Sequence, residues 1–332
     1  MDTTCVQYAF NHLDIEDVKE LEHVSNQEGY NCKYLQLTPG TYYGRLTTAK
    51  LNQTLVFLEQ HRRSASIAGA TPVDDYVIGI PLGNHGFYRA QGKKPDLSDV
   101  LLLKPGATFN LVSECNINFG YIQLPQEQMR KLCTAVDADV GKLNQYIVRS
   151  DPNAVKRLQH VLHLATKLLS EPEPVLLQAQ AIDAEQQLLG ALADVLSSMD
   201  PDNTTSDHFL SPNAKRILAL EARNHLEATL GESIKMIDLC AELDCQLRTL
   251  QHAFAGYFGS PATTYHKKIR MNAARRTLLQ ADPEVTTVTN VATRYGFWHL
   301  GRFALDYKQL FGESPSQSLA HVKPRFSYTS LR

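Results

Sequence analysis

The C-terminal part of the chain contains one pattern twice. The copies are 53 residues apart, since Leu250 corresponds to Phe303 and Phe258 to Phe311. Each copy ends in Phe-Gly, followed by Ser-Pro directly in the first copy and after Glu313 in the second. A glycine commonly ends a helix in the left-handed conformation, and Ser-Pro commonly begins the next helix. The repeat therefore predicts two similar helical units, joined by the segment that lies between the two copies.

The first copy, residues 233–258, has the spacing of a helix-turn-helix, in which two short helices are joined by a tight turn. Ser233 is suited to cap a helix over residues 234–243. Asp244 and Cys245 then form the predicted turn, and a second helix follows over residues 246–258.

The second copy, residues 287–311, has the same layout. Thr287 precedes a predicted helix over residues 288–295, and Gly296 supplies a turn in which a positive φ is easiest for glycine. The following helix is predicted over residues 298–311. Six apolar residues of the two units are assigned to the core by their helical spacing: Leu250, Phe254, Phe258, Phe297, Phe303 and Phe311.

Between the two units, residues 262–280 are predicted to form one long helix. Its inward face is expected to carry Tyr265, Ile269, Ala273 and Leu278. Its basic residues are expected to point mostly outward, and these are Lys267, Lys268, Arg270, Arg275 and Arg276.

The net charge of −2 conceals an uneven distribution of charge along the chain. Residues 1–210 contain 17 basic and 25 acidic side chains, whereas residues 211–332 contain 16 basic and 10 acidic ones. A basic part has the electrostatic sign needed to bind a polyanion, although a solvated protein face can produce the same imbalance. Together with the repeat, the charge favours nucleic acid as the partner of the C-terminal part.

The N-terminal part has a different periodicity. Short apolar or alternating runs separated by turn residues fill residues 30–125, which predicts an antiparallel β-sandwich or barrel over residues 1–125. Helical periodicity follows over residues 126–200, with segments near 126–134, 137–147, 152–169 and 174–198. The apolar stripe of the last segment could pack on its own domain or form a dimer. Residues 198–211 are rich in helix breakers and predict the boundary before a domain over residues 211–325.

Several classes of protein are disfavoured by the composition. No stretch has the length and apolarity of a membrane span, and no leader pattern is evident, so a cytoplasmic location is expected. The six cysteines are scattered without metal or redox spacing, which indicates reduced thiols. His61 and His85 stand singly in the strand region, so neither metal nor cofactor is expected. The absence of a nucleophile–base pairing or a phosphate-binding glycine loop argues against an enzyme.

The C-terminal repeat resembles the DNA-binding domain of the AraC/XylS family of bacterial regulators. The residues that carry the resemblance are Arg248 to Phe254 (RTLQHAF), Ile269 to Arg275 (IRMNAAR) and Tyr295 to Phe303 (YGFWHLGRF). The resemblance implies a multidomain α+β protein, in which an antiparallel cupin-like β-barrel precedes an all-α, homeodomain-like double helix-turn-helix. It further implies a transcription activator that responds to a small-molecule effector, forms a homodimer and contacts RNA polymerase.

The sequence departs from the family pattern at two places. Asp244-Cys245-Gln246 stands where a Gly-hydrophobic-Ser turn is usual, and Asp tolerates that backbone conformation less easily than Gly. Affinity from the first unit is therefore expected to be lower. Gly301 stands where the family often has Ser, and the missing side chain would let the helix approach the DNA groove closely.

The resemblance also implies which side chains contact DNA. The second helix of each unit would lie in a major groove, in two grooves one helical turn apart. The expected base-reading residues are Arg248, Gln251, His252, His299, Leu300, Arg302 and Leu305. The expected phosphate contacts are Ser233, Lys267, Lys268, Thr287 and Lys308, although any one of these lysines could be an ordinary surface charge.

The effector site is expected inside the β-barrel, where an arginine could neutralise a carboxylate ligand. The candidate residues are Tyr43, Arg45, Tyr76, Phe87, Tyr88 and Arg89. An alternative remains open, in which the regulator binds DNA without a ligand and its N-terminal domain only dimerises or binds a protein partner.

Overall fold

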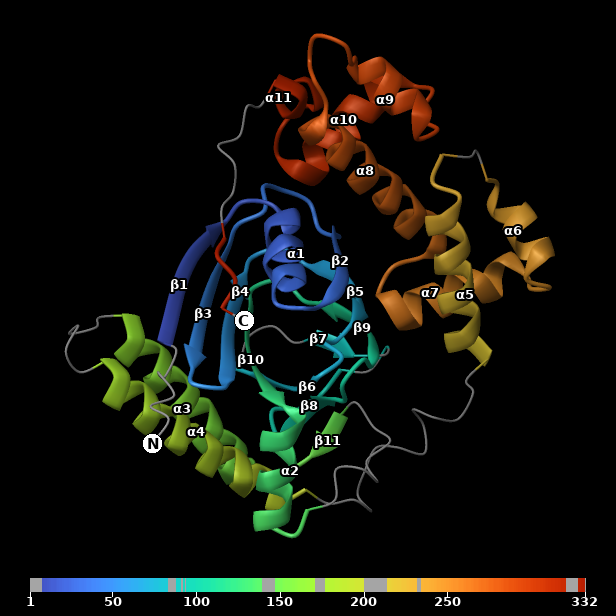
Figure 1. Cartoon of the computed structure of the whole chain (residues 1–332). Coiled ribbons are helices and arrows are strands. Elements are labelled where there is room, and N and C mark those ends of the chain that lie inside the picture. The colour runs from blue at the N-terminus through green and yellow to red at the C-terminus, as the bar shows by residue number, and fades with distance from the viewer. Residues whose placement is uncertain are drawn as a thin grey trace.

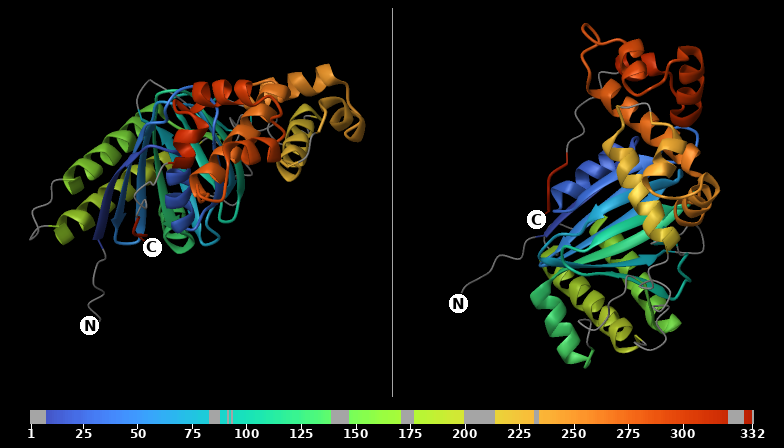
Figure 2. Two further views of the ribbon diagram at one scale, coloured as in Figure 1. Left: turned by 90° about the horizontal axis from the view of Figure 1, so that it is seen from above. Right: turned by 90° about the vertical axis from the view of Figure 1, so that its right-hand side faces the viewer.

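The computed structural model describes residues 8–82, 88–90, 92, 94–138, 147–170, 177–199, 214–231, 234–320 and 328–331. Within these residues, the N-terminal part forms two antiparallel sheets and the C-terminal part is helical (Figure 1). This arrangement confirms the predicted fold class. Helices α2 to α4 and the C-terminal helices lie on opposite sides of the sheets (Figure 2).

The described strands form a seven-stranded sheet in the order β1-β3-β4-β10-β6-β8-β11 and a four-stranded sheet in the order β2-β5-β9-β7. The strands of the larger sheet are β1 (Tyr8–Ile15), β3 (Gly44–Leu51), β4 (Thr54–His61), β6 (Asp75–Pro81), β8 (Asp99–Leu103), β10 (Ile117–Pro125) and β11 (Ile147–Arg149). Those of the smaller sheet are β2 (Asn31–Gln36), β5 (Ala65–Ala70), β7 (Tyr88–Ala90) and β9 (Thr108–Ser113).

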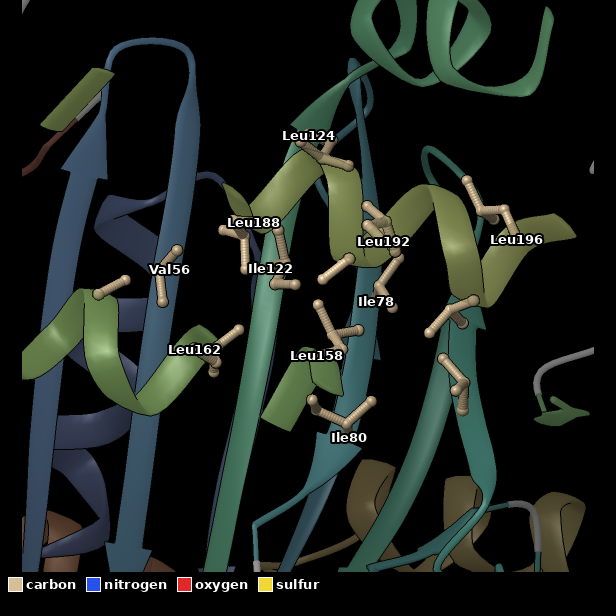
Figure 3. Close-up of a cluster of buried hydrophobic side chains, with 14 of the residues drawn as sticks. Val56, Ile78, Ile80, Ile122, Leu124, Leu158, Leu162, Leu188, Leu192 and Leu196 are labelled. Atoms are coloured by element: carbon tan, nitrogen blue, oxygen red, sulfur yellow. The ribbon is translucent and has the colours of Figure 1, made fainter. Parts of the chain in front are cut away.

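The larger sheet buries both faces because its strands alternate apolar side chains on each side. One face packs on α3 (Pro152–Ser170) and α4 (Leu177–Ser197). Figure 3 shows Leu158, Leu188 and Leu192 of these helices directed at Ile78 and Ile122 of the sheet. The apolar stripe predicted on the last helical segment therefore packs largely on its own domain. Homodimerisation stays a prediction.

Some elements differ from the sequence prediction. The apolar run at 51–58 is interrupted by a hairpin, because Asn52 adopts a left-handed conformation with φ of 56° that asparagine tolerates. The helix predicted over 137–147 is wrong at its C-terminal end, where β11 begins; residues 139–146 lie outside the described residues. Helix α1 (Val18–Gln27) and β1 were not predicted, because both lie before residue 30, where the predicted strand runs begin. Helix α2 (Gln126–Ala135) agrees with the prediction.

The C-terminal domain contains the helices expected from the repeat. They are α5 (Ala214–Ala228), α6 (Met236–Glu242), α7 (Leu247–Phe258), α8 (Ala262–Gln280), α9 (Val288–Arg294), α10 (Leu300–Phe311) and α11 (Pro315–Ala320). The boundary predicted at 198–211 falls almost entirely outside the described residues.

Equivalent positions of the two copies are buried alike, which confirms the repeat. Leu250 and Phe303 are buried, and so are Phe258 and Phe311. Each unit has its own apolar cluster, and α8 contributes to both, with Tyr265 and Ile269 in the first and Met271 and Leu278 in the second. Phe297 is only partly buried.

The expectation that the basic residues of α8 point mostly outward is wrong. Arg275 is buried, and Lys267, Lys268, Arg270 and Arg276 are at most half-exposed. The reason is that α8 packs against β2 of the N-terminal domain as well as against its own domain, so its polar face has protein partners.

Two further findings concern the whole chain. No helix among the described residues has the length and apolar character to cross a membrane. The described cysteines, Cys32, Cys115, Cys133, Cys240 and Cys245, are free thiols, and Cys5 lies outside the described residues.

Candidate nucleic-acid interface

The first helix-turn-helix unit is formed by α6 and α7. Asp244 makes the turn in a left-handed conformation with φ of 45°, and the backbone N–H of Cys245 donates to the carbonyl of Cys240 at 2.9 Å. Gln246 precedes α7 but makes no capping hydrogen bond through its side chain. The serine that is usual at this position in the family could accept such a bond, so the altered turn sequence leaves α7 without a side-chain cap. Gly259 ends α7 in the left-handed conformation.

The second unit is formed by α9 and α10. Thr287 caps α9 by accepting a hydrogen bond from the backbone N–H of Asn290 at 3.1 Å. Gly296 makes the turn with φ of 72°, as predicted. The guanidinium of Arg270 lies 4.8 Å from the centre of the Phe297 ring and donates to the carbonyl of Gly296 at 3.4 Å. Arg270 of α8 therefore supports the turn of the second unit.

The N-terminal halves of α7 and α10 present their side chains to solvent. Among the expected base-reading residues, Gln251 is half-buried, and the exposed ones are Arg248, His252, His299, Leu300, Arg302 and Leu305. Large apolar side chains are exposed here too: Leu305 is 68% exposed, Leu300 is 38% exposed, and Trp298, just before α10, is 68% exposed. An exposed leucine on a reading helix can meet a thymine methyl group.

Asp306 organises the outer face of α10 and was not identified from the sequence. Its carboxylate accepts from Nε of Arg302 at 3.0 Å and from Nζ of Lys267 at 2.5 Å. Burial acts to raise the pKa of Asp306, but the hydrogen bonds and charges of Lys267 and Arg302 outweigh it and lower that pKa. Asp306 therefore stays ionised and orients Arg302. The i, i+4 spacing of Arg302 and Asp306 is the sequence signal that could have revealed the pair.

The expected phosphate-contacting residues lie in different environments. Lys308 is exposed on α10. Lys267 is paired with Asp306, and burial lowers the pKa of the half-buried Lys268. The hydroxyl of Thr287 is used as a helix cap. Ser233 lies outside the described residues.

The N-terminal domain contains a cavity of about 50 Å³ between its two sheets. Of the six residues expected at an effector site, Tyr88 lines this cavity, and Phe87 lies outside the described residues. The other four, Tyr43, Arg45, Tyr76 and Arg89, do not line it. Arg45 instead pairs with Asp14 at 3.5 Å on the surface. The described residues that line the cavity are mostly apolar or aromatic and include one carboxylate, Glu59, which was not predicted from the sequence.

A seam of polar contacts, here the interdomain seam, joins α8 to the N-terminal domain. It consists of Asp17, Glu22 and Gln36 on the N-terminal side and Asn272, Arg275 and Arg276 on α8. The Asn272 amide makes two hydrogen bonds of 3.0 Å to the backbone of Gln36. Nε of Arg275 lies 2.7 Å from the carboxylate of Asp17, and Arg276 donates to both oxygens of Glu22.

Comparison with known proteins supports a DNA-binding role for the C-terminal domain. Residues 239–321 match the family model described as a helix-turn-helix domain. The chain is 41% identical over 101 residues to the probable thc operon regulatory protein of Rhodococcus erythropolis, a match that covers 30% of each protein. It is 24% identical over 252 residues to the XylDLEGF operon transcriptional activator of Pseudomonas putida, with 75% of each covered. These relatives are named as regulators of transcription.

Solved structures with some likeness to this chain include two regulators. One is a transcriptional regulator with an AraC-type DNA-binding domain from Chromobacterium violaceum, with 23% identity, a TM-score of 0.30, and coverage of 32% of this chain and 93% of that one. The other is the AraC-like transcriptional activator CuxR, with 13% identity, a TM-score of 0.42, and coverage of 86% of this chain and 100% of that one.

Proposed function

We propose, from the premise that this chain belongs to the AraC/XylS family of bacterial transcription regulators, that it is a ligand-responsive activator that binds specific DNA sequences in the cytoplasm. The observation that carries the proposal is the pair of helix-turn-helix units with equivalent buried positions and exposed second helices. In this proposal α7 and α10 enter two adjacent major grooves, and α8 sets the distance between them. The functional units are residues 1–125, 126–200 and 211–325.

We assign base contacts to the residues of α7 and α10 whose side chains are exposed. Arg302 and Arg248 are exposed arginines, and an arginine can bind guanine through two hydrogen bonds. His252, His299, Leu300 and Leu305 complete the exposed set, with Gln251 at its edge. Lys308 is suited to a phosphate contact, because it is exposed near the end of the same helix as Arg302. Lys267 would act indirectly, through Asp306.

The proposed response to a ligand rests on the position of β2. Cys32 and Tyr34 of this strand line the cavity, while Gln36 of the same strand bonds to α8. The backbone carbonyl of Tyr34 also accepts from Arg276 at 2.6 Å. A ligand in the cavity would therefore touch the strand that contacts the helix connecting both DNA-binding units. We also propose homodimerisation and contact with RNA polymerase, as the family resemblance implies.

Selection of genomic fragments by the purified full-length protein at about 150 mM salt tests the function. A DNA-binding regulator should enrich a small set of fragments over random DNA. On such a fragment, Arg302→Ala should lose roughly 1–3 kcal/mol of discrimination at one base pair. Lys308→Ala is the matched control and should weaken binding to all sequences alike, with a smaller dependence on salt. Enrichment of no sequence, with or without the cell's soluble metabolites, would contradict the function.

A further inference from the structure

The cavity between the two sheets has an unusual chemical lining. Most of its walls are aromatic or aliphatic, and Tyr34, Tyr88, Phe119 and Tyr121 are among the rings that surround it. Among the described residues, Glu59 is the carboxylate that lines it, and neither arginine nor lysine does. Aromatic faces and a carboxylate both attract positive charge. An anionic ligand would find no positive partner in this lining.

Glu59 projects into this space from β4 and is buried, with 1% of its surface exposed. The Tyr88 hydroxyl hydrogen-bonds to its carboxyl group. Its second acceptor, Oε1, has no hydrogen-bond partner. A buried acceptor without a donor is unfavourable, so this position favours a group that brings an N–H or O–H.

The neighbouring histidine does not supply that donor. Nε2 of His61 lies 3.4 Å from Oε1 of Glu59, yet neither atom has a hydrogen bond. Nδ1 of His61 is bonded to the backbone carbonyl of Arg63, so Nδ1 carries the proton in the neutral ring and Nε2 is an acceptor. Burial lowers the pKa of His61 to about 4, which keeps the ring neutral near pH 7. When Glu59 is ionised, two hydrogen-bond acceptors, its Oε1 and Nε2 of His61, therefore lie 3.4 Å apart with no donor between them.

We propose that this cavity binds a small alkylammonium effector whose N–H groups bond to the carboxylate of Glu59 while its carbon atoms contact the surrounding aromatic rings. This inference rests on the proposed function only in calling the ligand an effector. It replaces the carboxylate ligand expected from the sequence, because the arginines that would neutralise such a ligand do not line the cavity.

The size of the cavity limits the ligand. A water molecule needs roughly 10–15 Å³ of such space, so about 50 Å³ admits a ligand of roughly four heavy atoms unless side chains move. Isopropylammonium, isopropanol and acetate each have four heavy atoms and differ in charge. They form a matched set of probes, cationic, neutral and anionic.

The charge state of Glu59 adds a second readout. Burial raises the pKa of Glu59 to about 7, against the opposing effect of the Tyr88 hydrogen bond. The other titratable groups around it are His61, Cys32, Tyr34, Tyr42 and Tyr121. The pKa of each tyrosine and of Cys32 is raised, so these groups stay neutral up to pH 8. Binding of an ammonium ion favours ionised Glu59, so its affinity should rise between pH 6 and pH 8.

The test measures binding of the three probes to the full-length protein at pH 8, with ligand-observed NMR as the readout. Isopropylammonium should bind at least tenfold more tightly than isopropanol, and acetate should not bind detectably. Glu59→Gln should weaken isopropylammonium binding at least tenfold, whereas Glu16→Gln, which removes an exposed carboxylate from the same domain, should leave it unchanged.

Equal binding of the ammonium and the alcohol, binding of acetate, or binding of none of the three would overturn the inference. The comparison of probes on the unaltered protein decides this even where Glu59→Gln fails to fold. Selection of DNA fragments does not involve these probes, so failure here leaves the DNA-binding function standing, and failure of the selection leaves the ligand result standing.

Discussion

At the scale of single residues, the two units differ most clearly in what they present at the start of the second helix. The first unit has Asp244 in a left-handed turn and an uncapped α7. The second has Gly296 in its turn and Gly301 in the first turn of α10. Gly301 is exposed, and a Cβ atom added there would meet no other atom within 4 Å. Nothing within the protein therefore requires glycine at this position.

Gly301→Ala should change the stability of the protein and its affinity for DNA in opposite directions. Alanine has the higher helix propensity, so we expect the free energy of unfolding to rise by about 0.5–1 kcal/mol. The added methyl group would stand between α10 and the groove, so specific DNA binding should weaken roughly tenfold, about 1.4 kcal/mol. Denaturant unfolding and a DNA titration measure the two effects.

Gly190→Ala is the matched control for this substitution. Gly190 is exposed on α4, and a Cβ atom there also meets nothing within 4 Å. It should stabilise the protein by a similar amount without changing DNA affinity. If Gly301→Ala bound DNA as tightly as the parent, α10 would not approach a groove at this position.

Residue-level prediction from the sequence succeeded where helical periodicity determines the environment. The inward positions of α7 and α10 follow from spacing alone, and Leu250, Phe254, Phe303 and Phe311 are buried. It failed for the basic residues of α8, such as Arg275. Composition marks an arginine as polar and exposed, but only the tertiary structure shows that a carboxylate lies opposite it.

At the scale of elements, α8 packs on the N-terminal domain as well as on both units of its own domain. It joins both apolar clusters of the C-terminal domain and also packs on β2 across the interdomain seam. Asp17, which begins α1 through a capping box, is the partner of Arg275 although 258 residues separate them in sequence. A pairing at this separation leaves no local pattern, which is why it could not be predicted.

Asp17→Asn tests the seam. Arg275 is buried and would keep only Glu313 as an acidic partner at 2.6 Å, so we expect a loss of about 3 kcal/mol in the free energy of unfolding. Glu127→Gln removes a partner of Arg130 from a fully exposed surface pair, which solvent screens, and should cost much less than Asp17→Asn. Denaturant unfolding of both variants gives the comparison. Losses of equal size would show that the seam does not hold the two domains together.

At the scale of the whole molecule, the sheets place a cavity on one side of β2 and the DNA-binding domain on the other. The sequence predicted both domains and their order, because strand and helix periodicities differ strongly between the two parts. It did not predict the lining of the cavity, since Glu59 and the surrounding tyrosines come from strands that are far apart in the chain. The contact between the domains was likewise not predictable.

The central claim is that α7 and α10 read two major grooves one helical turn apart on a single face of the DNA. Hydroxyl-radical footprinting of the full-length protein on a selected fragment tests it most directly. We expect two protected segments per protomer about 10 base pairs apart, and loss of specific binding when five base pairs are inserted between them. A single protected segment, or specific binding that survives the insertion, would contradict the account.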